Sequence, residues 1–330
     1  MIRTQRRAAL LGAAALTLPW PLRAQAQAWR PSQAMRIIVP AAPGGTADIS
    51  ARVLAPWLQQ ALGQNCVVEN RSGGGGTIGT MEMLRAPADG HTMLLGNIGP
   101  QGIAYSLFRA MPYRPDSLLP VGGTVRGPNV LVVHPSVPAT SVPEFVAHLK
   151  RNPGKLSYGS AGVGQSPHLS AVWFSQLTGT EAVHVPFRGA APAAMELVAG
   201  NINFMFDNLT SGIQQIRAGR LRALAVTSAE RNPQVPEVPT LRETMPELAS
   251  FEVNSWFGIF LAAGAPRAAA EAINAAMQAW QATPEVRARW ADMGGLPLTG
   301  APDAFAAFVQ AEIAKWGAVI RREGLQMEIG

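Results

Sequence analysis

The fold of this chain is decided by one strand, the loop after it and the start of a helix: Met35-Arg36-Ile37-Ile38-Val39-Pro40-Ala41-Ala42-Pro43-Gly44-Gly45-Thr46. Residues 35–40 are typical of a short buried strand, and residues 41–46 form a glycine–proline loop. Apolar side chains then return at helical spacing, at Ile49, Val53, Leu54, Trp57, Leu58 and Leu62. A strand, a loop and a helix in this order predict a unit of a parallel α/β sheet.

Similar units follow along the chain. A second one has a strand at 66–69, a glycine run at 73–76, a helix through Met81 and Leu84, and a strand at 91–95. Further strands are expected at 129–133, 156–160, 182–185, 202–206, 221–227 and 256–261, with helices at 142–149 (capped by Ser141), 169–177 and 190–199, a proline-rich surface connection at 232–246, and two amphipathic helices at the C-terminus. The segment from 156 to 177 repeats the plan of residues 37–58, which predicts two lobes built alike.

Two glycine-rich loops are candidate anion sites, because ligands of α/β proteins bind at the carboxyl ends of strands. The first carries Gly44, Gly45, Thr46 and Asp48, and a tight turn that needs positive φ explains it equally well. The second carries Ser160, Gly162, Gly164 and His168, and adds hydroxyl groups. Backbone amides at the start of each following helix suit a carboxylate or a phosphate.

Asp207 follows an apolar strand, where it could accept a hydrogen bond from a ligand or cap a helix. Together with Ser160 or Ser166 and His168, it defines a competing interpretation, an exported serine hydrolase. Against this, a nucleophile elbow needs glycine two positions before the serine, and Tyr158 stands there.

Other site classes have little support. The glycines at 74, 76 and 79 match a dinucleotide pattern, but the next strand ends Leu95-Gly96-Asn97, without the acid that holds a ribose. Cys66 is the sole cysteine, so no internal disulfide can form, and His91, His134, His168 and His184 are scattered. We therefore predict neither a cofactor nor a metal. With no basic run after residue 28, we expect no nucleic-acid partner.

The N-terminus indicates export. Residues 1–28 combine Arg3, Arg6 and Arg7 with a short apolar run and a small-residue cleavage site, as in a signal peptide. Both the Sec and the twin-arginine routes remain open. Removing this segment takes away four arginines and no acid, which lowers the formal charge of the chain from +6 to +2.

The chain resembles the Bug family, periplasmic solute-binding proteins related to the tripartite tricarboxylate transporters. The resemblance rests on a set of motifs in order from residue 36 onward: residues 36–40, Pro43-Gly44-Gly45 with Asp48, Ala51-Arg52, Val68-Glu69-Asn70-Arg71 with Gly73, Asp89-Gly90-His91-Thr92, residues 158–164 with His168-Leu169, residues 184–189, Leu224-Ala225-Val226-Thr227 and Val238-Pro239-Thr240. Three positions depart from the family pattern, namely Ala41-Ala42, Phe187 and Cys66.

The resemblance implies a two-lobe, type II periplasmic-binding-protein fold that closes on a small organic carboxylate. It places Gly44, Gly45, Thr46 and Asp48 on one lobe, Ser160, Gly162, Gly164 and His168 on the other, and Asp207 beside the cleft. We expect lobe 1 to comprise residues 29–127 plus 254–330, and lobe 2 residues 128–253. The expected protein is a monomeric receptor, not an enzyme, serving a membrane permease or a sensor kinase; an exported scaffold without a ligand is a further alternative.

Overall fold

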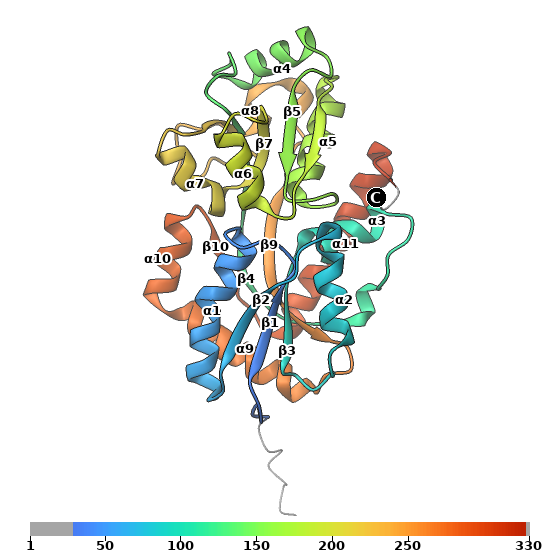
Figure 1. Ribbon diagram of the computed structural model, residues 1–330, viewed down its shortest axis with the longest axis vertical. Coiled ribbons are helices and arrows are strands. Elements are labelled where there is room, and N and C mark those ends of the chain that lie inside the picture. The colour runs from blue at the N-terminus through green and yellow to red at the C-terminus, as the bar shows by residue number, and fades with distance from the viewer. Residues whose placement is uncertain (1–28, 328–330) are drawn as a thin grey trace, which may run out of the picture.

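The structure is a computed structural model that describes residues 29–327, so the predicted signal peptide lies outside the described residues. Two lobes are stacked along the long axis of the molecule (Figure 1). Lobe 1 contains β1 (Met35–Val39), α1 (Thr46–Leu62), β2 (Cys66–Asn70), η1 (Gly74–Gly76), α2 (Thr77–Arg85), β3 (Thr92–Asn97), η2 (Gly99–Ile103), α3 (Ala104–Leu107), η3 (Pro115–Ser117), β9 (Asn254–Ala262), α9 (Arg267–Ala282), α10 (Pro284–Asp292), β10 (Leu296–Pro297) and α11 (Pro302–Glu323). Lobe 2 contains α4 (Val142–Arg151), β5 (Ser157–Ser160), α5 (Ser166–Thr178), β6 (Val183–Pro186), α6 (Ala190–Val198), β7 (Phe204–Asn208), α7 (Leu209–Arg217), β8 (Arg222–Val226), α8 (Leu241–Thr244) and η4 (Pro246–Leu248).

One long strand, β4 (Leu118–Val133), belongs to both lobes. Its residues 118–128 pair with β9, and its residues 129–133 pair with β7 and β8. The continuous strand order is β2-β1-β3-β9-β4-β7-β5-β6, with β10 and β8 also paired to β4. The two lobes are therefore joined by strands, not only by loops.

The prediction of a parallel sheet is confirmed for two groups of three strands and wrong for the strands between them. β1, β2 and β3 run parallel, as do β5, β6 and β7, whereas β9 and β4 run antiparallel to their neighbours. Short connections of strand, loop and helix give the parallel groups. The central strands return from the other lobe, which no local pattern signals.

Three expectations about elements need correction. The strand expected at 129–133 is only the last five residues of β4, because the glycines and prolines of residues 118–128 conceal the earlier part. The C-terminus forms three helices, not two. The proline-rich stretch at 232–246 is not purely a surface connection, since it contains α8 and buries Val235, Val238 and Leu241. The cap predicted for α4 is confirmed, because the Ser141 hydroxyl accepts a hydrogen bond from the Glu144 amide at 3.4 Å.

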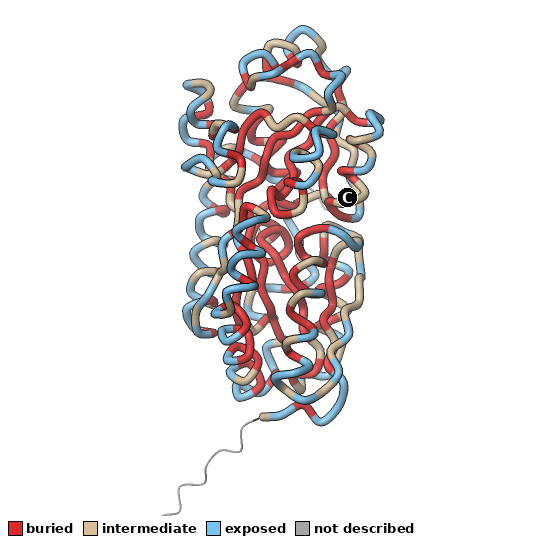
Figure 2. The backbone as a smooth tube through the Cα atoms, turned by 90° about the vertical axis from the view of Figure 1, so that its left-hand side faces the viewer, coloured by how far each residue is buried: buried red, intermediate tan, exposed pale blue. Residues whose placement is uncertain are grey.

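Buried residues lie along the strands and on the inner faces of the helices of each lobe, as the backbone coloured by burial shows (Figure 2). In lobe 1, Ile37 of β1, Leu54 of α1 and Ile273 of α9 belong to one buried cluster. In lobe 2, Val130 of β4, Leu197 of α6 and Ile213 of α7 belong to another. Within residues 29–327, no helix combines the length and the apolar character that a membrane span requires.

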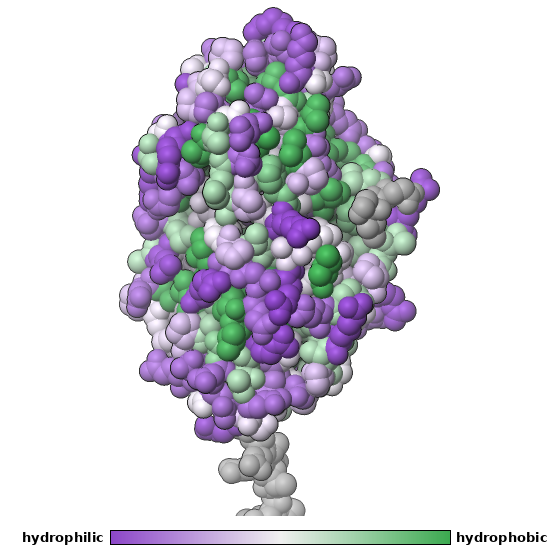
Figure 3. Space-filling view, viewed as in Figure 1, coloured by the Kyte–Doolittle hydropathy of each residue, from purple (hydrophilic) through white to green (hydrophobic). Residues whose placement is uncertain are grey.

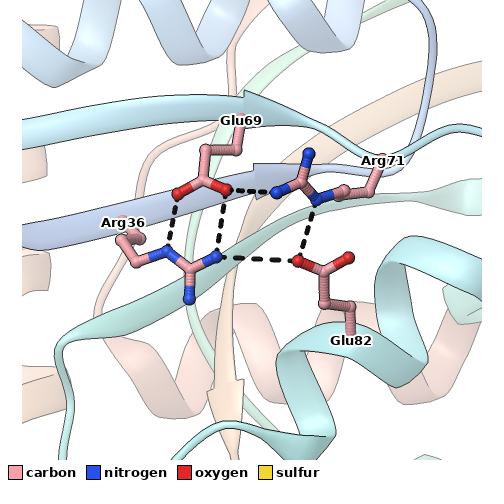
Figure 4. A network of polar contacts seen from close by, with 4 residues as sticks. All are labelled: Arg36, Glu69, Arg71 and Glu82. Carbon is pink, nitrogen blue, oxygen red and sulfur yellow. Dashed lines mark hydrogen bonds and ion pairs between the residues drawn. The ribbon is translucent and has the colours of Figure 1, made fainter.

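An ion-pair network fastens the open edge of the lobe 1 sheet. Arg36 of β1 binds both carboxylate oxygens of Glu69 on β2, at 2.6 and 3.0 Å (Figure 4). Arg71 bridges Glu69 at 2.7 Å and Glu82 of α2 at 2.9 Å. The network links β1, β2 and α2.

Candidate functional site

The candidate site lies where the lobes meet. The loop after β1 leads into α1, and the loop after β5 leads into α5, so both glycine-rich loops stand at the carboxyl ends of parallel strands. In Figure 1, α1 begins at the upper end of lobe 1, and α5, α6 and α7 lie above it in lobe 2. The sequence-predicted residues of both loops are thus brought to one region.

Asp48 organises the first loop from within. The Gly44 amide, with φ of +90°, donates to Asp48 Oδ2 at 2.9 Å. Arg52 Nε donates to both carboxylate oxygens at 3.0 Å, and Asn70 Nδ2 donates to Asp48 Oδ1 and to the Ala41 carbonyl at 3.0 Å each. Burial alone would raise the pKa of Asp48, but the hydrogen bonds from Arg52, Gly44 and Asn70 outweigh it and lower the pKa. The charged carboxylate of Asp48 therefore fixes the backbone of the first glycine-rich loop at Gly44.

Two neutral histidines organise the second loop. Ser160 Oγ lies 2.7 Å from His184 Nε2 and accepts the Gly162 amide at 3.2 Å. The Gly164 amide donates to His168 Nδ1 at 3.3 Å, and the two imidazole rings are 4.3 Å apart. Burial lowers the pKa of His168 to about 3, aided by the neighbouring His184, and lowers that of His184 to about 4. Both rings are therefore uncharged near neutrality and act as supports for the loop.

Asp207 lies inside β7, not after it, and is fully enclosed. Its Oδ1 accepts the Asn208 amide at 2.8 Å and the Ser211 hydroxyl at 3.4 Å, at the start of α7. Burial raises the pKa of this carboxyl to about 7, against which these two hydrogen bonds act only weakly. These contacts organise the turn that leads into α7, and no side-chain hydrogen bond caps the helix itself.

The contacts give no support to the hydrolase interpretation. Ser160 pairs with His184 instead of His168, and the hydrogen bonds of Asp207 go to residues of its own turn. Ser166, the other candidate nucleophile, lies 2.5 Å from the hydroxyl of Ser255. A nucleophile, a base and an orienting acid in mutual contact are what that chemistry needs.

The two lobes touch directly around the first loop. The Ala42 amide donates to the Arg188 carbonyl at 2.8 Å, and the hydroxyls of Thr46 and Thr210 are 2.6 Å apart. A Cβ on Gly45 would lie 3.5 Å from that of Ala190. The starts of α1, α6 and α7 therefore converge, with Gly45, Ala190 and Thr210 at the meeting point.

These helix starts lack side-chain caps. No side-chain hydrogen bond closes the N-terminus of α1, α5, α6 or α7, nor that of α2, α9 or α11, whereas Ser141 caps α4 and Thr283 caps α10. The first amides of a helix have no partner within the helix, and its dipole is positive at this end. Uncapped starts that converge between two lobes offer several donors to one anion.

A buried polar cluster lies where the strands cross between the lobes, and the sequence reasoning missed it. Asn208 Nδ2 donates to Asn129 Oδ1 at 2.6 Å and to Ser255 Oγ at 2.7 Å, and Ser255 Oγ donates to Asn129 Oδ1 at 2.9 Å. Asn129 Nδ2 reaches Ser170 at 3.1 Å. One signal was available: polar residues stand at the ends of three apolar strands, at 129, 208 and 255.

Three other features of the chain were considered as sites: metal-ligating side chains, the cysteine and the outer surface. Within residues 29–327, no three His, Cys, Asp or Glu side chains gather as metal ligands. Cys66 is half-buried in β2, where burial raises the pKa of its thiol to about 12. The face drawn in Figure 3 is mostly polar over both lobes, with small apolar groups between polar side chains.

Comparison with known proteins identifies the family. A family model described as tripartite tricarboxylate transporter family receptor matches residues 50–325. A protein encoded between tcbD and tcbE in Pseudomonas sp. (strain P51) is 38% identical over 316 residues, covering 96% of this chain and 94% of that one. The periplasmic binding protein BugD has a TM-score of 0.85 and 32% identity, covering 90% of this chain and 99% of its own.

Two solved structures contain ligands. A protein of R. palustris with adipate has a TM-score of 0.85 and 33% identity, covering 89% of this chain and 98% of its own. MatC from Rhodopseudomonas palustris with bound malate has a TM-score of 0.84 and 32% identity, covering 88% and 99%. The two-lobe fold, the family match and the likeness to BugD agree with one another, and this chain belongs to the tripartite tricarboxylate transporter receptors, the family of periplasmic solute-binding proteins that includes the Bug proteins.

Proposed function

We propose that this chain is an exported receptor that captures a small organic carboxylate between its lobes and delivers it to a tripartite tricarboxylate-type permease. The observation that carries the proposal is the convergence of uncapped helix starts from both lobes on two glycine-rich loops. Relatives of this chain have been solved with adipate and with malate, both dicarboxylates. The proposed ligand is therefore an aliphatic dicarboxylate.

In the proposed site, backbone amides and hydroxyls hold the carboxylate. We assign direct contacts to Gly45 and Thr46 on lobe 1 and to Ser160 on lobe 2. Gly44, Gly162 and Gly164 shape the two loops, because their amides already donate to Asp48, Ser160 and His168. Preorganised amides bind an anion without the cost of reorienting at the moment of binding. Asp48 and His168 belong to the site as supports, because their polar groups are already bound to the loops that they organise. Asp207 supports the start of α7.

The proposed movement is a hinge closure about the two crossing strands. The lobe boundaries that we propose are 29–127 with 254–330 for lobe 1, and 128–253 for lobe 2. The change of partners along β4 at Pro128 and Asn129 supports the first crossing, and the start of β9 at Asn254 supports the return. Closure would expel water from between the helix starts, which strengthens their interaction with a carboxylate.

The proposal also includes a cellular route. Residues 1–28 would be removed on export, and the receptor would work in the periplasm as a monomer. The likeness to BugD and the composition of residues 1–28 support this location.

A thermal-shift screen of residues 29–330 tests the function. We expect malate, adipate or another aliphatic dicarboxylate to raise the melting temperature, and tricarboxylates, amino acids and aromatic acids complete the panel. A ligand at 100 times its Kd stabilises the folded state by about 2.7 kcal/mol, a readable shift for a chain of this size. A well-folded protein that responds to none of these compounds, even after unfolding and refolding to remove any retained ligand, would contradict the proposal.

A further inference from the structure

The glycine run Gly73–Gly76 has no role in the function proposed so far, although it is the most unusual segment of the chain. All four residues have positive φ, at +129°, +55°, +60° and +100°. The run lies in lobe 1, between β2 and α2, and includes η1. Four consecutive residues in this region of backbone space require glycine, so the chain maintains a costly conformation here.

The glycine run contacts the second glycine-rich loop, which follows β5 in lobe 2. Gln165 Nε2 donates to the Gly75 carbonyl at 2.7 Å. A Cβ on Gly162 would lie only 3.4 Å from the Cα of Gly75, and a Cβ on Gly75 would collide with the carbonyl oxygen of Val163. The two backbones therefore meet with no side chain between them.

Gln165 extends the contact into lobe 1. Its side chain is 8% exposed, and its amide lies against the backbone of both Gly76 and Gly99, the first residue of η2. One residue of lobe 2 thus fits between two turns of lobe 1. Gln165 directly precedes α5, whereas Thr46 and Thr210 belong to α1 and α7. Figure 1 shows α2, α3 and α5 on one side of the molecule and α1 and α7 on the other.

We propose that Gly75, Gly162 and Gln165 form a closure contact, a set of positioning residues that fixes the closed arrangement of the lobes without touching the ligand. The inference rests on the proposed function, in which closure completes the site. A hydrogen bond that replaces one to water contributes modestly, so the contact is reversible. Because the measured affinity is the intrinsic affinity scaled by the closed fraction, the contact sets affinity from outside the pocket.

Two neighbouring glycines provide a matched pair for the test. Gly75→Ala inserts a methyl group into the contact with Val163. Gly74→Ala imposes a similar left-handed strain, at φ of +55° against +60°, but its methyl group would collide with the hydroxyl of Thr77, a residue of the same lobe. Comparing the two variants separates inter-lobe contact from backbone strain.

The readout is the distance between the lobes. Fluorescent dyes at Val67→Cys on lobe 1 and Met195→Cys on lobe 2, both exposed, report it in a Cys66→Ser background. Distances are recorded without ligand and with adipate or malate, and melting temperatures confirm folding. For Gly75→Ala we expect longer distances than for Gly74→Ala in at least one condition, and an affinity about tenfold weaker or worse. Gln165→Met removes the hydrogen bond that Gln165 donates. We expect it to lengthen the distance between the lobes and to weaken the affinity as well.

The outcomes separate the two proposals. Equal distances for Gly75→Ala and Gly74→Ala in every condition would overturn the closure contact, whatever the ligand. If no carboxylate changes the distances or the melting temperature of the unsubstituted protein, the carboxylate function fails. A longer distance in ligand-free Gly75→Ala would still support the closure contact in that case.

Discussion

Gly45 illustrates at the scale of one residue why this site uses glycine. Its φ of −84° and ψ of 172° are ordinary extended values, so conformation does not demand glycine here. The space limits the size of the side chain, because a Cβ would already lie in van der Waals contact with Ala190 of lobe 2 and a larger group would have no room. Gly44 differs, since its φ of +90° disfavours any side chain.

We predict that Gly45→Val abolishes carboxylate binding while the protein stays folded. Its branched side chain would occupy the space between the starts of α1 and α6, so neither carboxylate nor lobe could approach. Losing two hydrogen bonds to a charged group costs about 3 kcal/mol or more, roughly a hundredfold in Kd. Calorimetric titration measures this, and Gly45→Ala, whose methyl group fits at 3.5 Å, is the milder control. Unchanged affinity in Gly45→Val would show that the carboxylate does not bind beside Gly45.

At the scale of elements, the loop between β5 and α5 depends on one hydroxyl. Ser160 Oγ satisfies both the His184 imidazole and the Gly162 amide. We predict that Ser160→Ala lowers the free energy of unfolding by about 1–3 kcal/mol, because the half-buried His184 ring and the buried Gly162 amide lose their partner. Chemical denaturation measures the loss. Ser136→Ala, at an exposed serine that also bonds a histidine, should cost less. A stability equal to that of the unsubstituted protein would remove the supporting role from Ser160.

The elements that the sequence predicted best are those with local signals. Apolar spacing indicated α1, and Ser141 marked the start of α4. Both glycine loops were found because glycine and strand ends are visible in sequence. The crossing strands were found only in part, at 129–133 and 256–261, since residues 118–128 of β4 are rich in glycine and proline. Their antiparallel pairing was missed because the partners come from distant segments. The Asn129, Asn208 and Ser255 cluster was missed for the same reason, because its members are 47 to 126 residues apart.

At the scale of the whole molecule, buried titratable groups tie stability to pH. Asp207 has a pKa of about 7 in the folded protein and near the ordinary value of 3.8 when unfolded, so the folded state binds more protons between these values. Its contribution to stability is therefore present below about pH 4 and is lost as the pH rises toward 7. His168 and His184 act in the opposite direction, because their lowered pKa values favour the folded state as the pH rises toward 6.5.

We predict that Asp207→Asn gains stability relative to the unsubstituted protein as the pH rises from 4.5 to 7.5. The asparagine carbonyl can still accept from Asn208 and Ser211 but carries no charge to bury, and each unit of pKa difference corresponds to about 1.4 kcal/mol. Urea unfolding at three pH values measures the difference, in which the contributions of the two histidines cancel. A difference that stays constant across this range would contradict the titration of Asp207.

The place of β9 in the sheet has a consequence for how the chain is made. This strand lies between β3 and β4 in lobe 1, yet it is encoded after all the elements of lobe 2. A nascent chain that emerges N-terminus first can complete lobe 2 while the sheet of lobe 1 still lacks its central strand. The sheet of lobe 1 can therefore be completed only after residues beyond 262 have emerged, so the strands that the chain encodes first are among the last to gain all their neighbours.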